Sequence, residues 1–229
     1  TLQQSSAASD VYKRQDDMQG IGEVCHGHDV WMHVDGAYGG AGLAAPSIRE
    51  VFNGIELAHS FIVDPHKWLF APFDCCALIY QDPRLAREAH QQQGAYLEVV
   101  YDGVWNVSDY AHHLSRRARG LPLWFSLATH GTEAYADAVE QTLAVAKEAA
   151  VRIERHPDLE LVAEQNLSIC VFRRKGWKPE DYANWSDHQL ETGQSFVTPT
   201  KHNGETVLRF CIVNPRTTVQ HIEEILASL

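Results

Sequence analysis

Short apolar runs that end at turn-forming residues constrain the fold of this chain more than any other feature. Residues 30–34 and 60–63 are two such runs, and the turn signals Asp35-Gly36 and Asp64-Pro65 follow them directly. Runs of this length and composition are typical of buried strands. A third strand is predicted at residues 75–80, and a short helix at residues 47–53. Strands that alternate with short helices predict an α/β fold with a largely parallel sheet.

Two charged residues come directly after neighbouring predicted strands. Asp35 follows the first strand, and Lys67 follows the second strand in the run Asp64-Pro65-His66-Lys67-Trp68. In open parallel sheets, ligands bind beyond the carboxyl ends of the strands. We therefore expect Asp35 and Lys67 to meet at one edge of the sheet.

A lysine and an aspartate in this arrangement suit the chemistry of pyridoxal 5'-phosphate. A lysine amine forms a Schiff base with the aldehyde of this cofactor, and a carboxylate keeps the pyridine nitrogen protonated so that the ring withdraws electrons. A carboxylate about 4 Å from a pyridinium is attracted by about 4 kcal/mol at an effective dielectric of ~20, which is enough for this task. Taken separately, Lys67 also fits a surface turn, and Asp35-Gly36 also fits a plain turn signal.

Residues next to this pair are further candidates for the site. Gly36 and Ala37 are small enough for a planar ring to approach the backbone closely. Histidine titrates near neutral pH, so His66 is suited to hydrogen-bond either a phosphate oxygen or a substrate, although a plain turn position also explains it. Ser60 and Asp64 are further candidates for contacts with the phosphate.

The sequence of the second half of the chain predicts a smaller layer of strands and helices. Residues 81–110 have weak periodicity and are predicted to be loop-rich. Leu121-Pro122-Leu123-Trp124 ends that segment, and a long helix is predicted over residues 132–155. Strands at residues 168–173 and 207–213 and helices within residues 177–193 and 218–229 follow. We therefore expect two domains with a boundary near Phe125, the larger at residues 16–124 and a small α+β domain at residues 125–229.

Composition argues against several classes of function. The net charge of −11 argues against a nucleic-acid partner, because no basic stripe offsets it. No window of 18 consecutive apolar residues occurs, so we expect no membrane partner. The five cysteines are odd in number and form no Cys-x-x-Cys pair, which predicts a reducing compartment and a cytoplasmic protein. The cluster Cys25-His26-Gly27-His28 is spaced too tightly for a zinc site, so no metal is expected.

The beginning of the chain differs from the rest. Residues 1–15 are rich in glutamine, serine and alanine and show no periodicity. They have neither the apolar core of a signal peptide nor the arginine bias of a transit peptide. We expect this segment to be a disordered or non-native tail.

Several motifs resemble the group II pyridoxal-phosphate-dependent amino acid decarboxylases, which include the aromatic-L-amino-acid and glutamate decarboxylases. The lysine motif is the most specific of them, and the similarity runs from about residue 16 to the end of the chain. The motifs are His33-Val34-Asp35-Gly36-Ala37-Tyr38-Gly39-Gly40, Ser60-Phe61-Ile62-Val63-Asp64-Pro65-His66-Lys67-Trp68-Leu69, Phe73-Asp74-Cys75-Cys76-Ala77, Arg116-Arg117-Ala118-Arg119 and residues 208–218.

The resemblance implies a fold of the aspartate aminotransferase type (type I), here part of the large α/β domain plus a small C-terminal α+β domain. It implies that Lys67 holds pyridoxal phosphate covalently and that Asp35 binds the pyridine nitrogen. Ala37 would pack on one face of the ring, and His66 would lie near the phosphate. The resemblance also implies a small-molecule amino acid as substrate and a homodimer whose active site lies at the subunit interface.

Two more residues receive roles from the resemblance. Tyr96 lies in a segment similar to the family's mobile catalytic loop, where a phenol would return a proton to the substrate carbon after CO₂ leaves. Relatives with phenylalanine there tend towards oxidative aldehyde formation, so Tyr96 favours decarboxylation. Arg209 resembles the arginine that binds the substrate carboxylate, a task that suits a guanidinium. A loop aromatic and an ion-pair partner are the simpler interpretations of Tyr96 and Arg209.

The chain departs from the family in length, since family members are much longer, and it resembles the C-terminal half of such an enzyme. We expect pyridoxal-phosphate-dependent decarboxylation of an L-amino acid, with an aromatic one favoured and with Lys67, Tyr96 and His66 as catalytic residues. Two alternatives remain open. One is an aldehyde synthase of the same fold, and the other is a non-catalytic interaction module.

Overall fold

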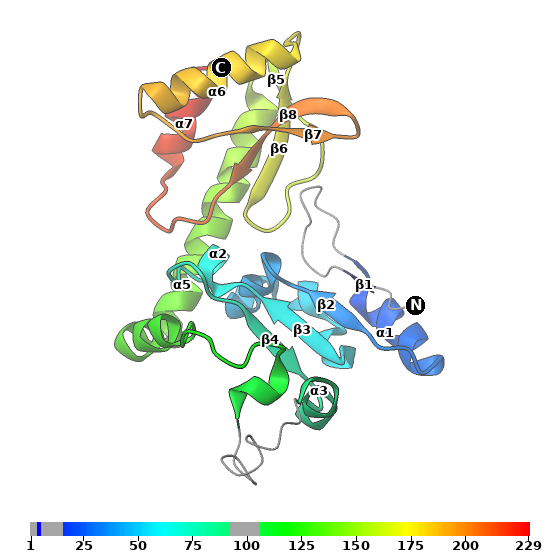
Figure 1. Ribbon diagram of the computed structural model, residues 1–229. Helices are drawn as coiled ribbons and strands as arrows, with labels where there is room; N and C mark the ends of the chain where they lie inside the picture. The colour runs from blue at the N-terminus through cyan, green and yellow to red at the C-terminus, as the bar shows by residue number, and fades with distance from the viewer. Residues whose placement is uncertain (1–3, 6–15, 92–105) are drawn as a thin grey trace.

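Two sheets joined by one long helix make up this protein, for which the computed structural model describes residues 4–5, 16–91 and 106–229 (Figure 1). The first sheet has the strand order β1-β2-β3-β4. The pairs β1–β2 and β2–β3 are parallel and β3–β4 is antiparallel, so the prediction of a largely parallel sheet is confirmed. The strands are β1 (Gln4–Ser5), β2 (His33–Asp35), β3 (Ser60–Val63) and β4 (Ala77–Tyr80).

Short helices connect the strands of this sheet. The carboxylate of Asp17 begins the first of them by accepting a hydrogen bond of 2.9 Å from the amide of Gly20. The helix predicted at residues 47–53 is present, but it is a 3₁₀ helix. The helices are α1 (Met18–Gly27), η1 (Gly39–Ala44), η2 (Pro46–Phe52), η3 (Ile55–Leu57), α2 (Pro65–Trp68), α3 (Pro83–His90) and η4 (Val107–Tyr110).

Residues 81–110 are more ordered than the sequence predicts. They contain α3 and η4, so the expectation of a loop-rich segment is wrong for these two stretches. The overlooked signal is Asp82-Pro83. The Asp82 side chain accepts a hydrogen bond of 2.9 Å from the Arg84 amide, and Pro83 occupies the first turn, where its missing N–H costs nothing.

Helix α5 (Leu121–Arg155) spans both sheets and bends at Gly131. Gly131 has φ 78° and ψ 163°, values that only glycine adopts easily, so the helix has a first segment before this residue and a second segment after it. The second segment agrees with the helix predicted over residues 132–155. Leu121 begins the first segment instead of ending a loop, and position 125, where a domain boundary is predicted, lies inside it.

The second sheet is antiparallel and has the strand order β5-β6-β8-β7. Its main core packs Val145, Ala149 and Ile153 of α5 against Phe172 and Leu208 of the sheet. A small α+β layer in this half of the chain is thereby confirmed. Its other elements are β5 (Leu159–Leu161), β6 (Ile169–Arg174), α6 (Pro179–Glu191), β7 (Pro199–His202), β8 (Glu205–Cys211) and α7 (Val219–Ala227).

One hydrophobic cluster belongs to both halves of the molecule. Trp68 of α2 packs there with Val139 and Leu143 of α5 and with Leu167, which lies just before β6. This shared core holds the end of the lysine motif against the long helix. None of the helices in the described ranges is long and apolar enough to cross a membrane.

Of the segment predicted as a tail, residues 4 and 5 form β1, and residues 1–3 and 6–15 lie outside the described residues. The prediction for residues 1–15 therefore stays a prediction.

Candidate active site

The structure brings the two charged motifs to the same edge of the first sheet. Because β2 and β3 are parallel, with Asp35 opposite Ile62, both strands end on the same side. The Ala37 amide donates to the Asp35 carboxylate at 3.0 Å. The Asp64 amide donates to the Ala37 carbonyl, also at 3.0 Å. Direct hydrogen bonds therefore connect the aspartate motif with the first residue of the lysine motif.

Lys67 lies on the short helix α2, directly beyond β3, and its amine forms an ion pair of 2.8 Å with Asp64. The side chain of Lys67 is 41% exposed and that of Asp64 is 14% exposed. An ion pair of this exposure is weak because water screens it, so it holds the amine in place without blocking its release. Lys67 also lines a pocket of about 620 Å³ together with Phe70, His130 and Tyr135.

The two further candidates for phosphate contacts are occupied elsewhere. Asp64 is paired with Lys67, and a second anion next to its carboxylate would be repelled. Ser60 lies at the opposite end of β3 and is buried, where its hydroxyl accepts a hydrogen bond from the Trp31 indole at 2.9 Å and contacts the His33 ring at 2.7 Å. This arrangement does not favour either residue as a phosphate ligand.

His66 has a ring orientation fixed by its neighbours. Its Nδ1 lies 3.0 Å from the amide nitrogen and 2.5 Å from the carbonyl oxygen of Cys75. The ring also meets the edge of Phe73, with centroids 5.0 Å apart. Since Nδ1 is used by the Cys75 backbone, Nε2 is the ring nitrogen left for a ligand.

Cys76 is a second nucleophile close to Lys67. Partial burial of its sulfur, together with a hydrogen bond to the Asp64 carboxylate, raises the pKa of the Cys76 thiol to about 11. The thiol therefore stays protonated at neutral pH, and a protonated thiol is a poor nucleophile. This environment does not favour the Cys76 thiol as the group that reacts with an aldehyde.

Tyr38 is a residue whose position the sequence did not predict. Its ring stacks on Trp68, with centroids 5.2 Å apart and an angle of 9° between the rings, and its hydroxyl hydrogen-bonds the Ser168 hydroxyl. Burial raises the pKa of Tyr38 far above its ordinary value, Cys211 adds to this effect, and Ser168 and the charge of Arg209 oppose it. Tyr38 therefore remains a neutral phenol that links the lysine helix to the second sheet. The only signal in the sequence is its place three residues after Asp35.

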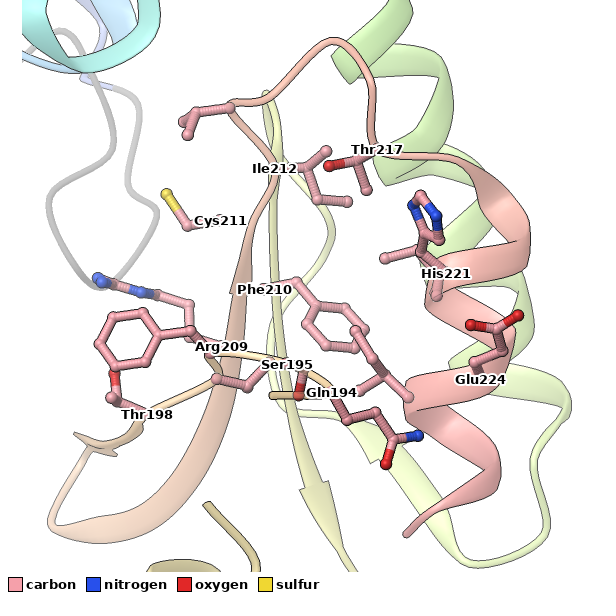
Figure 2. A pocket seen from close by; sticks show the side chains of 15 residues that line it. Gln194, Ser195, Thr198, Arg209, Phe210, Cys211, Ile212, Thr217, His221 and Glu224 are labelled. Atoms are coloured by element: carbon pink, nitrogen blue, oxygen red, sulfur yellow. The ribbon is translucent and has the colours of Figure 1, made fainter. Parts of the chain in front are cut away.

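Arg209 lies on β8, in the second sheet, and lines a pocket of about 550 Å³ with Cys211 and His221 (Figure 2). Its effect on the pKa of Tyr38 places the guanidinium near the phenol. No side-chain hydrogen bond or ion pair joins the Arg209 guanidinium to another residue in the described ranges. The structure therefore brings Arg209 towards Tyr38 but not into the pocket that Lys67 lines. Tyr96 lies outside the described residues.

Gly36 is required by packing between strands. A Cβ atom at this position would lie 2.3 Å from Phe61 Cε2 and 2.9 Å from the Ile62 carbonyl oxygen. Residues of β3 fill the space beside Gly36. Close packing of β2 on β3 therefore explains this glycine, in addition to the expected room for a ring. Ala37, which is half-buried, stays the small residue available to a ligand.

Replacing Gly36 with alanine is expected to lower the free energy of unfolding by about 1–3 kcal/mol, because backbone and a ring must both move. The urea midpoint measures this change. Gly27→Ala is the matched control, since a Cβ at Gly27 has no atom within 4 Å. Equal midpoints for the two variants would contradict the close packing of β2 on β3.

The groups gathered at this edge fit pyridoxal phosphate by their chemistry. Lys67 supplies an accessible amine for an aldehyde, and Asp35 supplies an exposed carboxylate for a pyridinium. His66 offers Nε2 for a phosphate oxygen, and Ala37 is small enough to lie under a ring. No cluster of three or more His, Cys, Asp or Glu side chains able to hold a metal ion occurs in the part of the chain that the structure describes.

Comparison with known proteins decides the family. Residues 7–175 match the family model of the pyridoxal-dependent decarboxylase conserved domain. The chain belongs to this family. Its membership confirms the predicted resemblance and, at the level of the family, the predicted cofactor.

The chain is 31% identical over 201 residues to the 3,4-dihydroxyphenylacetaldehyde synthase of Aedes aegypti, with 86% of this chain and 38% of that protein covered. It is 31% identical over 214 residues to the aromatic-L-amino-acid decarboxylase of Sus scrofa, with 90% and 43% covered. It thus spans less than half of the length of these relatives.

Solved structures confirm the fold of this chain. The tryptophan decarboxylase of Catharanthus roseus, solved in complex with L-tryptophan, superposes with a TM-score of 0.82 and 25% identity, over 97% of this chain and 47% of that chain. The glutamate decarboxylase domain of a Vibrio parahaemolyticus enzyme gives a TM-score of 0.79 and 28% identity, over 97% and 44%.

Proposed function

We propose that this protein takes part in the pyridoxal-phosphate-dependent decarboxylation of an L-amino acid, preferably an aromatic one, to the amine and CO₂. The observation that carries the proposal is the common sheet edge that holds Asp35 and Lys67. Support for an aromatic substrate comes from the relatives, which include an aromatic-L-amino-acid decarboxylase and a tryptophan decarboxylase bound to L-tryptophan.

Each residue at the edge has a task in this proposal. Pyridoxal phosphate, when bound, supplies an aldehyde for an amine and a ring that accepts the electrons of the broken bond to the carboxylate. Lys67 leaves Asp64 to hold the cofactor and later releases the amine product. Asp35 keeps a proton on the ring nitrogen, and Ala37 lies against the ring. His66 donates to the phosphate from Nε2.

Two residues at the substrate complete the proposal. Tyr96 returns a proton to the carbon that has lost CO₂, which makes the amine the product. Arg209 binds the substrate carboxylate through its guanidinium. The guanidinium has no hydrogen-bond or ion-pair partner among the described residues, which supports this role because a half-buried guanidinium needs polar partners.

Arg209→Gln is expected to raise the KM for the amino acid about tenfold or more with little change in kcat, because it removes a charged hydrogen bond to the ground-state substrate. Steady-state amine formation measures this. Arg209→Lys keeps the positive charge but loses the two parallel N–H donors of the guanidinium. Its KM should therefore lie between the KM of the parent and that of Arg209→Gln. A fall in kcat at unchanged KM would contradict a binding role.

Product analysis tests the proposed reaction. The protein is incubated with pyridoxal phosphate and L-tyrosine, L-tryptophan or L-3,4-dihydroxyphenylalanine, and CO₂, amine, aldehyde, oxygen and peroxide are followed. Release of CO₂ with an equal amount of amine supports the proposal. Oxygen uptake with aldehyde and peroxide instead identifies an aldehyde synthase, the activity of the Aedes aegypti relative by its name. Neither product with any L-amino acid would contradict both.

We further propose a cytoplasmic protein that acts as a homodimer. The five cysteines support the first point, since none of them forms a disulfide in the structure. The family resemblance supports the second point.

A further inference from the structure

Tyr38 contacts both halves of the molecule next to the proposed site. On one side its ring stacks on Trp68, the neighbour of Lys67 on α2, with ring centroids 5.2 Å apart. On the other side it packs against a buried apolar cluster of the second sheet, which consists of Ile169, Val171 and Val207. The proposed reaction gives this tyrosine no task so far.

Tyr38 packs on the face of the second sheet from which Arg209 projects. Side chains alternate along a strand, so Val207, Arg209 and Cys211 of β8 share one face. Figure 2 shows the side chains of Arg209 and Cys211 pointing away from α7, whereas Phe210 points towards it. Since Tyr38 contacts Val207, it lies beside the base of the Arg209 side chain.

Hydrogen bonds connect Tyr38 and its neighbour with both motifs. The Tyr38 hydroxyl bonds the Ser168 hydroxyl, which is fully buried. The Ile212 amide, directly after β8, donates to the Ser168 carbonyl at 2.9 Å. On the other side, the Ala37 carbonyl accepts a hydrogen bond from the Asp64 amide at 3.0 Å. Two consecutive residues therefore connect the end of β8 with the first residue of the lysine motif.

The substrate of the proposed reaction has to reach groups on both sheets. Its amine reacts with the cofactor held by Lys67 on α2, and its carboxylate binds Arg209 on β8. A displacement of about 1 Å between two such groups is enough to slow an enzymatic reaction strongly. Tyr38 lies between α2 and β8, in contact with both elements.

We propose that Tyr38 is a positioning residue, which holds Arg209 at a fixed place relative to Lys67. Its ring, stacked on Trp68, sets the orientation of α2, and its hydroxyl, bonded to Ser168, sets the position of β8. This inference rests on the proposed function, because it takes Lys67 as the cofactor lysine and Arg209 as the carboxylate ligand. Removal of the hydroxyl alone should displace Arg209 and leave Lys67 in place.

Tyr38→Phe tests this inference, because it keeps the ring stack and removes the hydroxyl. The probe is 3-(4-hydroxyphenyl)propanoate, which has a carboxylate and an aromatic ring but no amine to displace Lys67. Calorimetric titration in the presence of pyridoxal phosphate should give a Kd about fivefold higher for the variant, as expected for loss of one hydrogen bond. The KM for an L-amino acid should rise equally at little changed kcat, and borohydride labelling of Lys67 should be unchanged. Equal Kd values, or a parent chain that does not bind the probe, overturn the proposal.

Ser168→Ala separates a positioning role from a purely structural one. Tyr38→Phe leaves the buried Ser168 hydroxyl without this partner, which lowers the free energy of unfolding. The double variant lacks both hydroxyls, so its urea midpoint should return most of the way to that of the parent. Its Kd for the probe should stay raised, because the hydrogen bond is still absent. Recovery of the Kd together with the urea midpoint would leave Tyr38 a structural role only and overturn the proposal.

Tyr182→Phe is the matched control. Tyr182 is also buried, and its hydroxyl donates to the Arg174 carbonyl at 3.2 Å, in the main core of the second sheet. Its replacement should lower the urea midpoint and leave the Kd for the probe unchanged. An equal rise in Kd for Tyr182→Phe would show that any loss of packing in this half weakens binding, which contradicts a specific role of Tyr38.

Product analysis judges the proposed function separately. Probe binding that depends on the Tyr38 hydroxyl, without amine or aldehyde from any L-amino acid, would overturn the decarboxylation and leave the positioning role in place. Amine formation with equal Kd and KM values for the parent and Tyr38→Phe would overturn the positioning role and leave the decarboxylation in place.

Discussion

Replacing Lys67 with alanine is expected to abolish the covalent attachment of pyridoxal phosphate. The parent chain, mixed with the cofactor and reduced with borohydride, should carry one reduced phosphopyridoxyl group on the peptide that contains Lys67. The variant should show only background labelling, because Lys67 is the one amine that pairs with Asp64 within the described residues. Amine formation by an active preparation should fall by at least about a thousandfold, as expected for loss of a covalent group.

Lys147→Ala is the matched control for this experiment. Lys147 is an exposed lysine on α5, away from the edge that holds Asp35. Its replacement should leave labelling at Lys67 unchanged, which distinguishes a site from the general reactivity of surface amines with aldehydes. Peptide mass spectrometry reads the position directly. Equal labelling of the Lys67→Ala variant and the parent would remove the basis of the proposed function.

Replacing Trp68 with alanine is expected to lower the free energy of unfolding by about 3–5 kcal/mol, the largest stability effect that we predict. Trp68 is fully buried, stacks on Tyr38 and donates a hydrogen bond of 2.9 Å to the Thr142 hydroxyl. Its removal leaves a cavity between α2 and α5, and the Thr142 hydroxyl loses the donor from Trp68 while it keeps its own hydrogen bond to the Val139 carbonyl. Because α2 also carries Lys67, the rate of cofactor attachment should fall as well.

Urea denaturation followed by circular dichroism measures the loss of stability. Trp124→Ala is the control with the same change in size, since Trp124 is 59% exposed on the first segment of α5. Surface substitutions of this kind usually change stability by less than about 0.5 kcal/mol. Similar midpoints for the two variants would show that the cluster around Trp68 does not hold the two sheets together.

Strands with strong local signals could be predicted from the sequence. The bounds of β3 agree with the prediction at residues 60–63, and β8 overlaps the strand predicted at residues 207–213. Both strands contribute apolar residues to a buried core, so the spacing of their apolar residues and their composition both indicate a strand. The edge strands β5 and β7 were missed, because three or four residues carry too little pattern to recognise. Helix α1 was also missed, although Asp17 supplies an N-cap signal for its ten residues.

The candidate site was predictable where its residues are close in sequence to a strand end. Asp35 and Lys67 follow parallel strands, and the edge they share follows from that order alone. The contact between Tyr38 and Ser168 joins residues 130 positions apart, so no local pattern indicates it. The ion pair of Lys67 with Asp64 was also missed, since the sequence suggested a phosphate contact for this aspartate.

The cluster that Trp68 shares with Val139, Leu143 and Leu167 makes the two sheets thermodynamically dependent on each other. Neither half can lose its packing without exposing side chains of the other half to water. The chain should therefore melt in a single cooperative transition, and a disturbance near the lysine helix should be felt as far away as the carboxyl-terminal strands.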